Sequence, residues 1–148
     1  MMTMQLSKAA EVLAGRCVSA DVLFHGVSTD TRQLQQGSLY VALQGPNHDG
    51  HDYLDAARER GAAAAAVSHI TNTSLPLLEV DDTRLALGRL AAYWRAQFTL
   101  PVVAVTGSNG KTTVRSMMHA ILSRAGRTLA TQGNLNNDIG LPLTLFRL

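Results

Sequence analysis

The sequence contains a single cysteine, Cys17, which excludes a disulfide within the chain. Such scarcity is typical of proteins from a reducing compartment. The sequence also lacks a long apolar run, and its opening stretch, MMTMQLSKAAEVLAG, includes a lysine and a glutamate. These charges argue against a secretory signal and against a membrane span. We therefore expect a cytoplasmic protein with no membrane partner.

Clusters of basic residues are also missing. Lysine and arginine total 13 against 11 aspartate and glutamate, a net charge of +2, and they are scattered along the chain. A nucleic-acid-binding surface needs basic residues gathered on one face, so no nucleic acid partner is expected. The 46% apolar and 16% charged shares are those of a soluble globular protein. With 148 residues, the chain is long enough for one domain or two small ones.

The hydrophobic pattern of the first half predicts helices alternating with strands. Ser7 is the expected cap of a helix that ends at Leu13, with Gly15 in a left-handed conformation after it. The stretch from there to STDTR is expected to be irregular. Further elements are predicted as follows: strands at 37–43, 62–69 and 76–80, a helix from Asp52 to the stop at Gly61, and a helix over 83–98 capped by Asp82.

The second half begins, by this pattern, at a domain break near residues 81 and 82. A strand from Pro101, a glycine turn, a helix from Thr112 to Arg124 and a strand over 127–130 follow in order. Strand, crossover helix and strand in this order open a parallel sheet. The expected fold is α/β, with a small N-terminal domain over 1–81 followed by the start of a parallel-sheet domain over 82–148.

The turn before this helix has the composition of a phosphate-binding loop. Gly107 and Gly110 allow backbone N–H groups to converge on an anion, and the helix start adds its partial positive charge. Lys111 is placed to reach nucleotide phosphates, and the Thr112 hydroxyl is placed to coordinate Mg²⁺. Val105 stands where the full Walker pattern has its first glycine. The alternative is a plain strand-turn-helix corner with an exposed lysine.

The stretch VTGSNGKTT, without that first glycine, resembles the ATP loop of the Mur ligases and their folylpolyglutamate synthetase relatives. STDTR, followed by GSLYVALQG and HDGHDYLDAARERGAAAAAV, resembles the N-terminal UDP-binding domain of the ligases that act late in building the peptidoglycan stem peptide. TQGNLNNDIGLPLTLFRL is similar to the central domain of the D-alanyl-D-alanine-adding branch. Ligases that add the third stem residue usually carry threonines in place of NLNN. Together these motifs cover essentially the whole chain.

The resemblance implies two groups of site residues. The ATP loop comprises Gly107, Ser108, Asn109, Gly110, Lys111, Thr112 and Thr113, with catalytic roles for Lys111 on the phosphates and for Thr112 on Mg²⁺. The residues implied for the UDP-linked substrate are Ser28, Thr29, Asp30, Thr31, Arg32, Asn47, His48, Asp49, Gly50, Asn134, Asn136 and Asn137. Hydroxyl groups and a guanidinium suit diphosphate oxygens as donors.

Simpler interpretations of the same residues stay open. STDTR alone is more often a solvated turn, because Ser, Thr and Asp bond their own backbone readily. The asparagines of NLNN could serve the same turn chemistry. His48 and His51 could suggest a metal pair, but no third ligand stands nearby in the sequence, so solvated imidazoles are the expectation.

The implied reaction is ATP-dependent amide formation. A free carboxylate is a poor acyl donor because its leaving group would be an oxide. In the family, the γ-phosphoryl group of ATP activates the carboxylate of UDP-MurNAc-tripeptide as an acyl phosphate, which the amine of D-alanyl-D-alanine attacks. The full-length enzyme is expected to be a monomer. Since the chain stops soon after the central domain begins, we expect a fragment that does not turn over by itself.

Three other functions compete with this one. A Mur ligase that adds the third stem residue is the nearest alternative, and a small P-loop kinase or NTPase is the second. The third is a UDP-sugar-binding module that is not an enzyme. Binding of UDP-MurNAc-tripeptide and of ATP with Mg²⁺ separates the classes. The ligase is expected to bind both, the kinase or NTPase only ATP with Mg²⁺, and the UDP-sugar-binding module only UDP-MurNAc-tripeptide.

Overall fold

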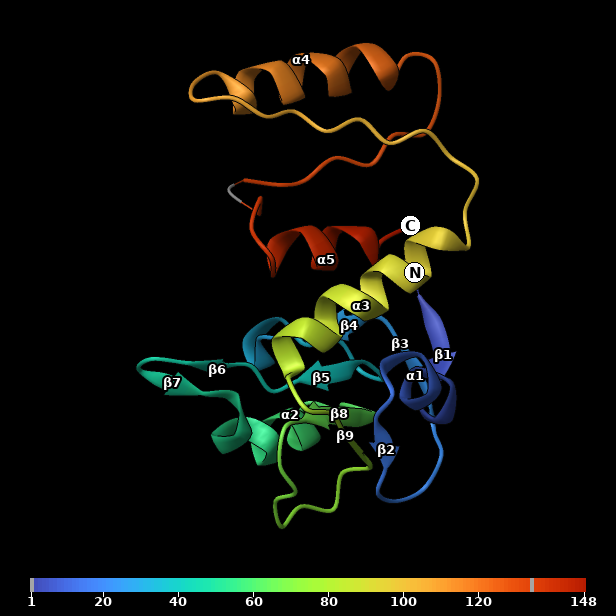
Figure 1. Ribbon diagram of the computed structural model, residues 1–148, viewed down its shortest axis with the longest axis vertical. Helices are drawn as coiled ribbons and strands as arrows, with labels where there is room; N and C mark the ends of the chain where they lie inside the picture. Colours follow the sequence, from blue (N-terminus) through green and yellow to red (C-terminus); the bar gives the residue numbers. More distant parts are fainter. Residues whose placement is uncertain (1, 134) are drawn as a thin grey trace.

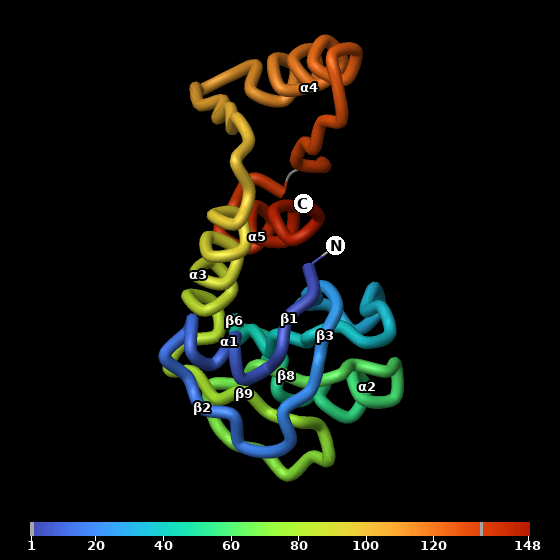
Figure 2. The backbone as a smooth tube through the Cα atoms, turned by 90° about the vertical axis from the view of Figure 1, so that its right-hand side faces the viewer, coloured from blue at the N-terminus to red at the C-terminus, as the bar shows by residue number. Residues whose placement is uncertain are grey.

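The computed structural model describes residues 2–133 and 135–148. The molecule is elongated, with a small mixed sheet at one end and helix α4 (Lys111–Leu122) at the other (Figures 1 and 2). Within the described residues, no helix is both long enough and apolar enough to cross a membrane.

The main sheet has five strands in the order β2–β9–β8–β5–β4. Pairs β4–β5, β5–β8 and β8–β9 are parallel, whereas β2 is antiparallel to β9 at one edge. Two small antiparallel pairs, β1–β3 and β6–β7, flank it. The strand bounds are β1 Thr3–Gln5, β2 Arg16–Cys17, β3 Leu23–His25, β4 Val27–Ser28, β5 Leu39–Val41, β6 Gln44–Gly45, β7 His48–Asp49, β8 Ala64–Val67 and β9 Leu77–Glu79.

Helices cover both faces of this sheet. Successive side chains of β8 alternate between two cores: Ala64 and Ala66 join the core of α1 and α3, and Ala65 and Val67 join the core of α2. A parallel sheet covered on both faces needs apolar side chains on both. This explains why an alanine run forms a buried strand here. The helix bounds are α1 Leu6–Leu13, η1 Thr31–Gln33, η2 Gly50–Tyr53, α2 Leu54–Glu59, α3 Thr83–Ala96 and α5 Gly140–Leu145.

The N-terminal segment departs from the predicted pattern. Gln5, not Ser7, occupies the N-cap of α1, and Ser7 instead donates its amide and hydroxyl to the Asp21 carboxylate at 2.8 Å each. Those bonds hold the pKa of Asp21 below its ordinary value. Ala14, with φ 52°, takes the left-handed conformation that was expected of Gly15. The stretch expected to be irregular contains β2, β3 and β4.

Helix α3 connects the two halves of the molecule. The Asp82 carboxylate accepts hydrogen bonds from the amides of Arg84 (2.8 Å) and Leu85 (2.9 Å), which confirms the predicted cap. The helix packs on α1 and on α5 (Figure 1). Thr83 fixes its first turn to the sheet, because its hydroxyl donates to the Ala42 carbonyl at 2.8 Å in a buried setting. The division at residues 81 and 82 stays a prediction.

The second half forms its helices but not the predicted strands. Helix α4 is confirmed, whereas residues 101–106 and 127–130 are not assigned to strands. A strand exists only where another backbone accepts and donates its hydrogen bonds, and the structure pairs neither segment with any described strand. None of the described residues of α4 is buried, and Val114, Met117 and Ile121 are exposed. Helix α5 was not predicted.

Candidate functional site

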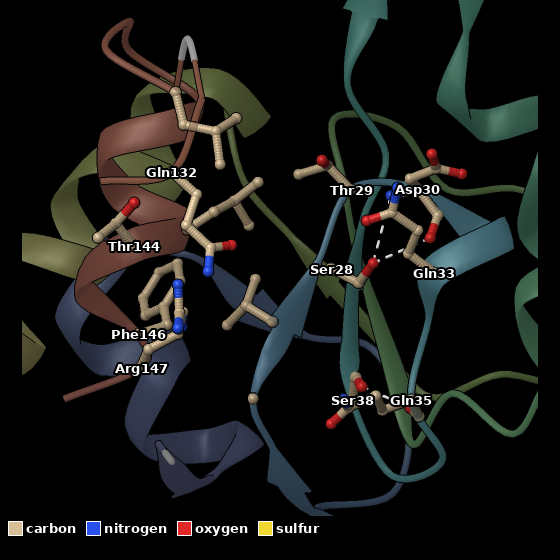
Figure 3. Close-up of a pocket in the computed structure, with 14 residues that line it drawn as sticks. Ser28, Thr29, Asp30, Gln33, Gln35, Ser38, Gln132, Thr144, Phe146 and Arg147 are labelled. Atoms are coloured by element: carbon tan, nitrogen blue, oxygen red, sulfur yellow. Dashed lines mark hydrogen bonds between the residues drawn. The ribbon is translucent and has the colours of Figure 1, made fainter. Parts of the chain in front are cut away.

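A cavity of about 570 Å³ lies between the β4 edge of the sheet and α5 (Figure 3). This volume is within the range of small-molecule sites. One wall is formed by residues 26–30 together with Gln33, Gln35 and Ser38, and the opposite wall by Gln132, Leu135, Leu143, Thr144, Phe146 and Arg147. Two segments that lie more than ninety residues apart in the sequence therefore share one cavity.

The first wall carries the start of the STDTR motif. Ser28 ends β4, and its hydroxyl donates to the Asp30 carbonyl at 3.0 Å while accepting from the Asp30 amide at 3.3 Å. Asp30 caps the short helix η1 by accepting from the Arg32 amide at 2.9 Å. This is the turn chemistry typical of Ser and Asp, and it also presents Ser28, Thr29 and Asp30 to the cavity.

The Arg32 side chain forms an ion pair with Asp30. Its guanidinium nitrogens contact both carboxylate oxygens, at 2.8 to 3.2 Å, and its side chain is 83% exposed. The hydrogen bond from Arg32 is the main reason that the pKa of Asp30 lies below its ordinary value. Thr31 begins η1 beside this pair. Neither Thr31 nor Arg32 lines the cavity.

The second wall depends on a close approach at the start of α5. A Cβ on Gly140 would lie 2.5 Å from the Leu135 Cα, so only glycine lets the two backbones meet. The Asn137 side chain accepts from the Gly140 amide at 2.8 Å, which is the turn role left open for this asparagine. An ion pair between Asp138 and Arg84 ties this turn to α3. Asn136 is exposed, and Asn134 lies outside the described residues.

The predicted residues Asn47, His48, Asp49 and Gly50 lie on the β6–β7 hairpin and its exit, which does not line the cavity. Asp49 accepts from the amide (2.9 Å) and Nδ1 (2.6 Å) of the buried His51. The Ser68 amide donates to Nε2 of His51 at 3.1 Å, so this nitrogen carries no proton. The hairpin is therefore anchored through His51. Among the described residues, no group of three or more acidic, histidine or cysteine side chains could hold a metal ion.

This anchor makes stability sensitive to acid. Hydrogen bonds from the His51 amide and ring lower the pKa of Asp49. A carboxyl group whose pKa is lower in the folded than in the unfolded protein stabilises the fold at any pH above its unfolded pKa, which is about 3.9 for Asp. This stabilisation is lost as the pH falls through the pKa of the folded state. We expect Asp49→Asn to reduce stability at pH 7 and to flatten its decline below about pH 4. Urea denaturation at several pH values measures this. Parallel acid declines in both proteins would contradict the assignment.

The predicted phosphate-binding loop precedes α4, far from the sheet (Figure 2). Gly107 and Gly110 have φ of 148° and 77°, positive as the motif requires. Gly110 is the N-cap of α4 and supplies no side-chain cap, so the first amides of the helix are left for an anion. Lys111 folds over the loop, where its ammonium group donates to the carbonyls of Gly107 and Ser108. Thr112 and Thr113 are exposed beside it.

The structure thus shows two separate candidate sites. Ser28, Thr29 and Asp30 meet in the cavity, whereas no residue of the phosphate loop lines it. The cavity residues that the motifs did not indicate are Gln33, Gln35, Ser38, Gln132, Thr144 and Arg147. Ser38 stands inside the quoted stretch GSLYVALQG, and Gln132, Thr144 and Arg147 stand inside TQGNLNNDIGLPLTLFRL, but no pattern within these stretches singled them out.

Comparisons with known proteins find relatives that cover the whole chain. The family model described as Mur ligase family, catalytic domain, matches residues 23–95, and the model of the Mur ligase middle domain matches residues 105–148. The chain belongs to the Mur ligase family. The first matched segment contains the sheet wall of the cavity, and the second contains the phosphate loop and the α5 wall.

Relatives within the Mur ligases agree with the D-alanyl-D-alanine-adding branch. UDP-N-acetylmuramoyl-tripeptide–D-alanyl-D-alanine ligase of Escherichia coli K12 is 51% identical over 148 residues, covering 100% of this chain and 33% of the relative. A crystal structure of MurF from Acinetobacter baumannii superposes with a TM-score of 0.93 at 36% identity, covering 100% of this chain and 34% of that one. The structure of MurF ligase from Thermotoga maritima in complex with ADP superposes with a TM-score of 0.75 at 32% identity. The match covers 82% of this chain and 29% of that one. The chain spans about a third of these relatives.

Proposed function

We propose that this chain supplies the UDP-substrate site and the ATP loop of a ligase that joins D-alanyl-D-alanine to UDP-MurNAc-tripeptide. The observation that carries this proposal is the cavity between Ser28–Asp30 and α5, in a chain that is 51% identical from end to end to the E. coli ligase. Its cytoplasmic location and monomeric state remain predictions from the sequence.

The chemistry assigned to the loop follows from charge. Phosphoryl transfer relies on positioning and on neutralising the phosphoryl oxygens, with little covalent work by the protein. Lys111 is the cation of the described loop, and the free amides at the start of α4 add hydrogen-bond donors. Mg²⁺ prefers oxygen ligands, so the exposed Thr112 hydroxyl fits a magnesium ion, which would further neutralise the phosphates.

Because the cavity and the loop lie apart, we assign them to opposite ends of the substrate. In this proposal, the cavity holds the uridine diphosphate end, and the peptide extends toward the loop, where its terminal carboxylate receives the γ-phosphoryl group. The acyl phosphate is then attacked by the amine of D-alanyl-D-alanine, and phosphate leaves. The cavity orients the substrate, and the loop lowers the barrier to phosphoryl transfer.

A chimeric enzyme tests this function. The 148 residues are fused to the remaining two-thirds of the E. coli relative, and formation of UDP-MurNAc-pentapeptide is followed by chromatography. We expect product that requires ATP, and none from UDP-MurNAc-dipeptide as the control substrate. A chimera that folds but forms no more product than the E. coli portion alone would contradict the proposal.

A further inference from the structure

We propose that Arg147, assisted by the Gln132 amide, holds the diphosphate of the UDP-linked substrate, and that Arg32 is not the main diphosphate contact. This inference rests on the proposed function and adds to it the residue that sets the preference for a nucleoside diphosphate. Both residues lie on the α5 side of the cavity (Figure 3).

The charges that line the cavity favour Arg147. Among the described lining residues, Arg147 is the only one with a cationic side chain, and Asp30 is the only carboxylate. The Asp30 charge is already compensated by its two-pronged contact with Arg32. A diphosphate entering this space therefore meets one uncompensated charge of opposite sign on the wall, that of Arg147. Guanidinium groups suit phosphate oxygens because they donate two parallel hydrogen bonds.

Arg32 would have to give up a good partner to bind the ligand. Its guanidinium contacts both oxygens of Asp30, which lines the cavity, whereas Arg32 is not a lining residue. If Arg32 left this pair for a phosphate, Asp30 would face the diphosphate with its charge uncompensated. Repulsion between the Asp30 carboxylate and the negatively charged diphosphate opposes this exchange of partners. The arrangement is most favourable when Arg32 stays with Asp30.

Three of the four hydroxyl groups that line the cavity already donate their protons within the protein. Ser28 donates to the Asp30 carbonyl, Ser38 to the Gln35 carbonyl and Thr144 to the Gly140 carbonyl. These three oxygens can offer lone pairs, which phosphate oxygens do not accept. Donation to a diphosphate therefore falls to the Thr29 hydroxyl, to side-chain amides and to the guanidinium, and only the guanidinium carries a charge. Figure 3 shows the Gln132 amide directed into the gap that faces Ser28.

Arg147 is held in place by buried neighbours. Phe146 is 3% exposed and joins the core of α1 and α3, and its carbonyl accepts from the Met2 amide at 3.3 Å. The Arg147 amide donates to the Thr144 carbonyl at 3.1 Å. The backbone that carries the guanidinium is thus fixed to Met2, the residue before β1, which reduces the entropy lost when a ligand is bound.

Calorimetric titration of the 148-residue chain with UDP and with UMP tests the inference. We expect Arg147→Gln to weaken UDP binding by about tenfold or more, because a charge-assisted contact is lost. The loss should be smaller for UMP and should diminish at high salt. Arg147→Lys should fall between wild type and Arg147→Gln, and Gln132→Ala should weaken UDP binding severalfold. Arg124→Gln, an exposed arginine beyond α4, is the matched control and should bind UDP as wild type does.

The outcomes separate this inference from the proposed function. UDP binding that is unchanged in Arg147→Gln, or that falls further in Arg32→Gln than in Arg147→Gln, overturns the assignment of Arg147 and leaves the UDP site standing. A wild-type chain that does not bind UDP overturns the proposed substrate site itself. Thermal unfolding of each variant is measured alongside, and Arg147→Lys keeps the comparison valid should Arg147→Gln unfold early.

Discussion

Replacing Lys111 with alanine is expected to lower the turnover of the chimeric ligase by at least about 100-fold. The first turn of α4 presents free amides, and Lys111 adds the one full positive charge of the described loop. Its ammonium group already reaches across the loop to the Gly107 and Ser108 carbonyls, so phosphate oxygens in the same concavity lie within its reach. Charge that develops on the transferred phosphoryl group loses this stabilisation in the variant.

The matched control for this variant is Lys8→Ala. Lys8 is the other lysine of the sequence, and it pairs with Glu11 on the surface of α1 at 2.8 Å. Its removal also costs one positive charge, but far from the loop, and should leave turnover within twofold, a margin set by the small energies of surface pairs. The assignment of Lys111 would be wrong if Lys111→Ala kept more than about a tenth of the wild-type rate.

Replacing Phe24 with alanine is expected to lower the free energy of unfolding by about 3–5 kcal/mol. Phe24 is 0% exposed and lies opposite Met4 in the β1–β3 pair. It belongs to the core that contains Leu6 and Phe146. The truncation removes a large apolar surface and leaves a cavity that these neighbours fill only in part. Domains are typically stable by about 5–15 kcal/mol, so the variant should lose much of its stability.

Urea denaturation followed by circular dichroism measures the Phe24 effect against Leu23→Ala. Leu23 is the adjacent residue on β3 and is 46% exposed, so its truncation should cost no more than about 0.5 kcal/mol. The two residues are adjacent on the same strand and differ mainly in burial, although Phe is also the larger side chain. Similar losses in the two variants would show that Phe24 does not have the core position described.

Local signals in the sequence predicted the elements that local interactions determine. The Asp82 cap and the start of α4 after Gly110 depend on residues within one turn; the cap lies where the sequence placed it, and α4 begins at Lys111, one residue before the predicted start. Strands β1 and β3 escaped prediction because they are short and pair across about twenty residues, so neither shows a period of its own. Residues 101–106 have the composition of a strand, but composition cannot supply a pairing partner.

The sequence predicted residues of the cavity wall beside β4 but not those of the wall beside α5. Ser28, Thr29 and Asp30 form a recognisable motif, and the structure places them together. Arg32 belongs to the same motif, but its pairing with Asp30 could not be told from a solvated turn without coordinates. Gln132 and Arg147 come from a distant segment, and only the packing of α5 brings them opposite β4. The roles of Asn47–Gly50 and of Asn136 stay predictions.

The measurement that tests the account most directly is an amide-resolved NMR titration of the ¹⁵N-labelled chain with UDP-MurNAc-tripeptide. If the cavity between β4 and α5 receives the uridine diphosphate, saturable shift changes should appear together at Ser28, Thr29, Gln132 and Arg147. The β6–β7 hairpin, Gln44–Asp49, should respond less. Changes confined to that hairpin, or no saturable change on either wall of the cavity, would contradict the account.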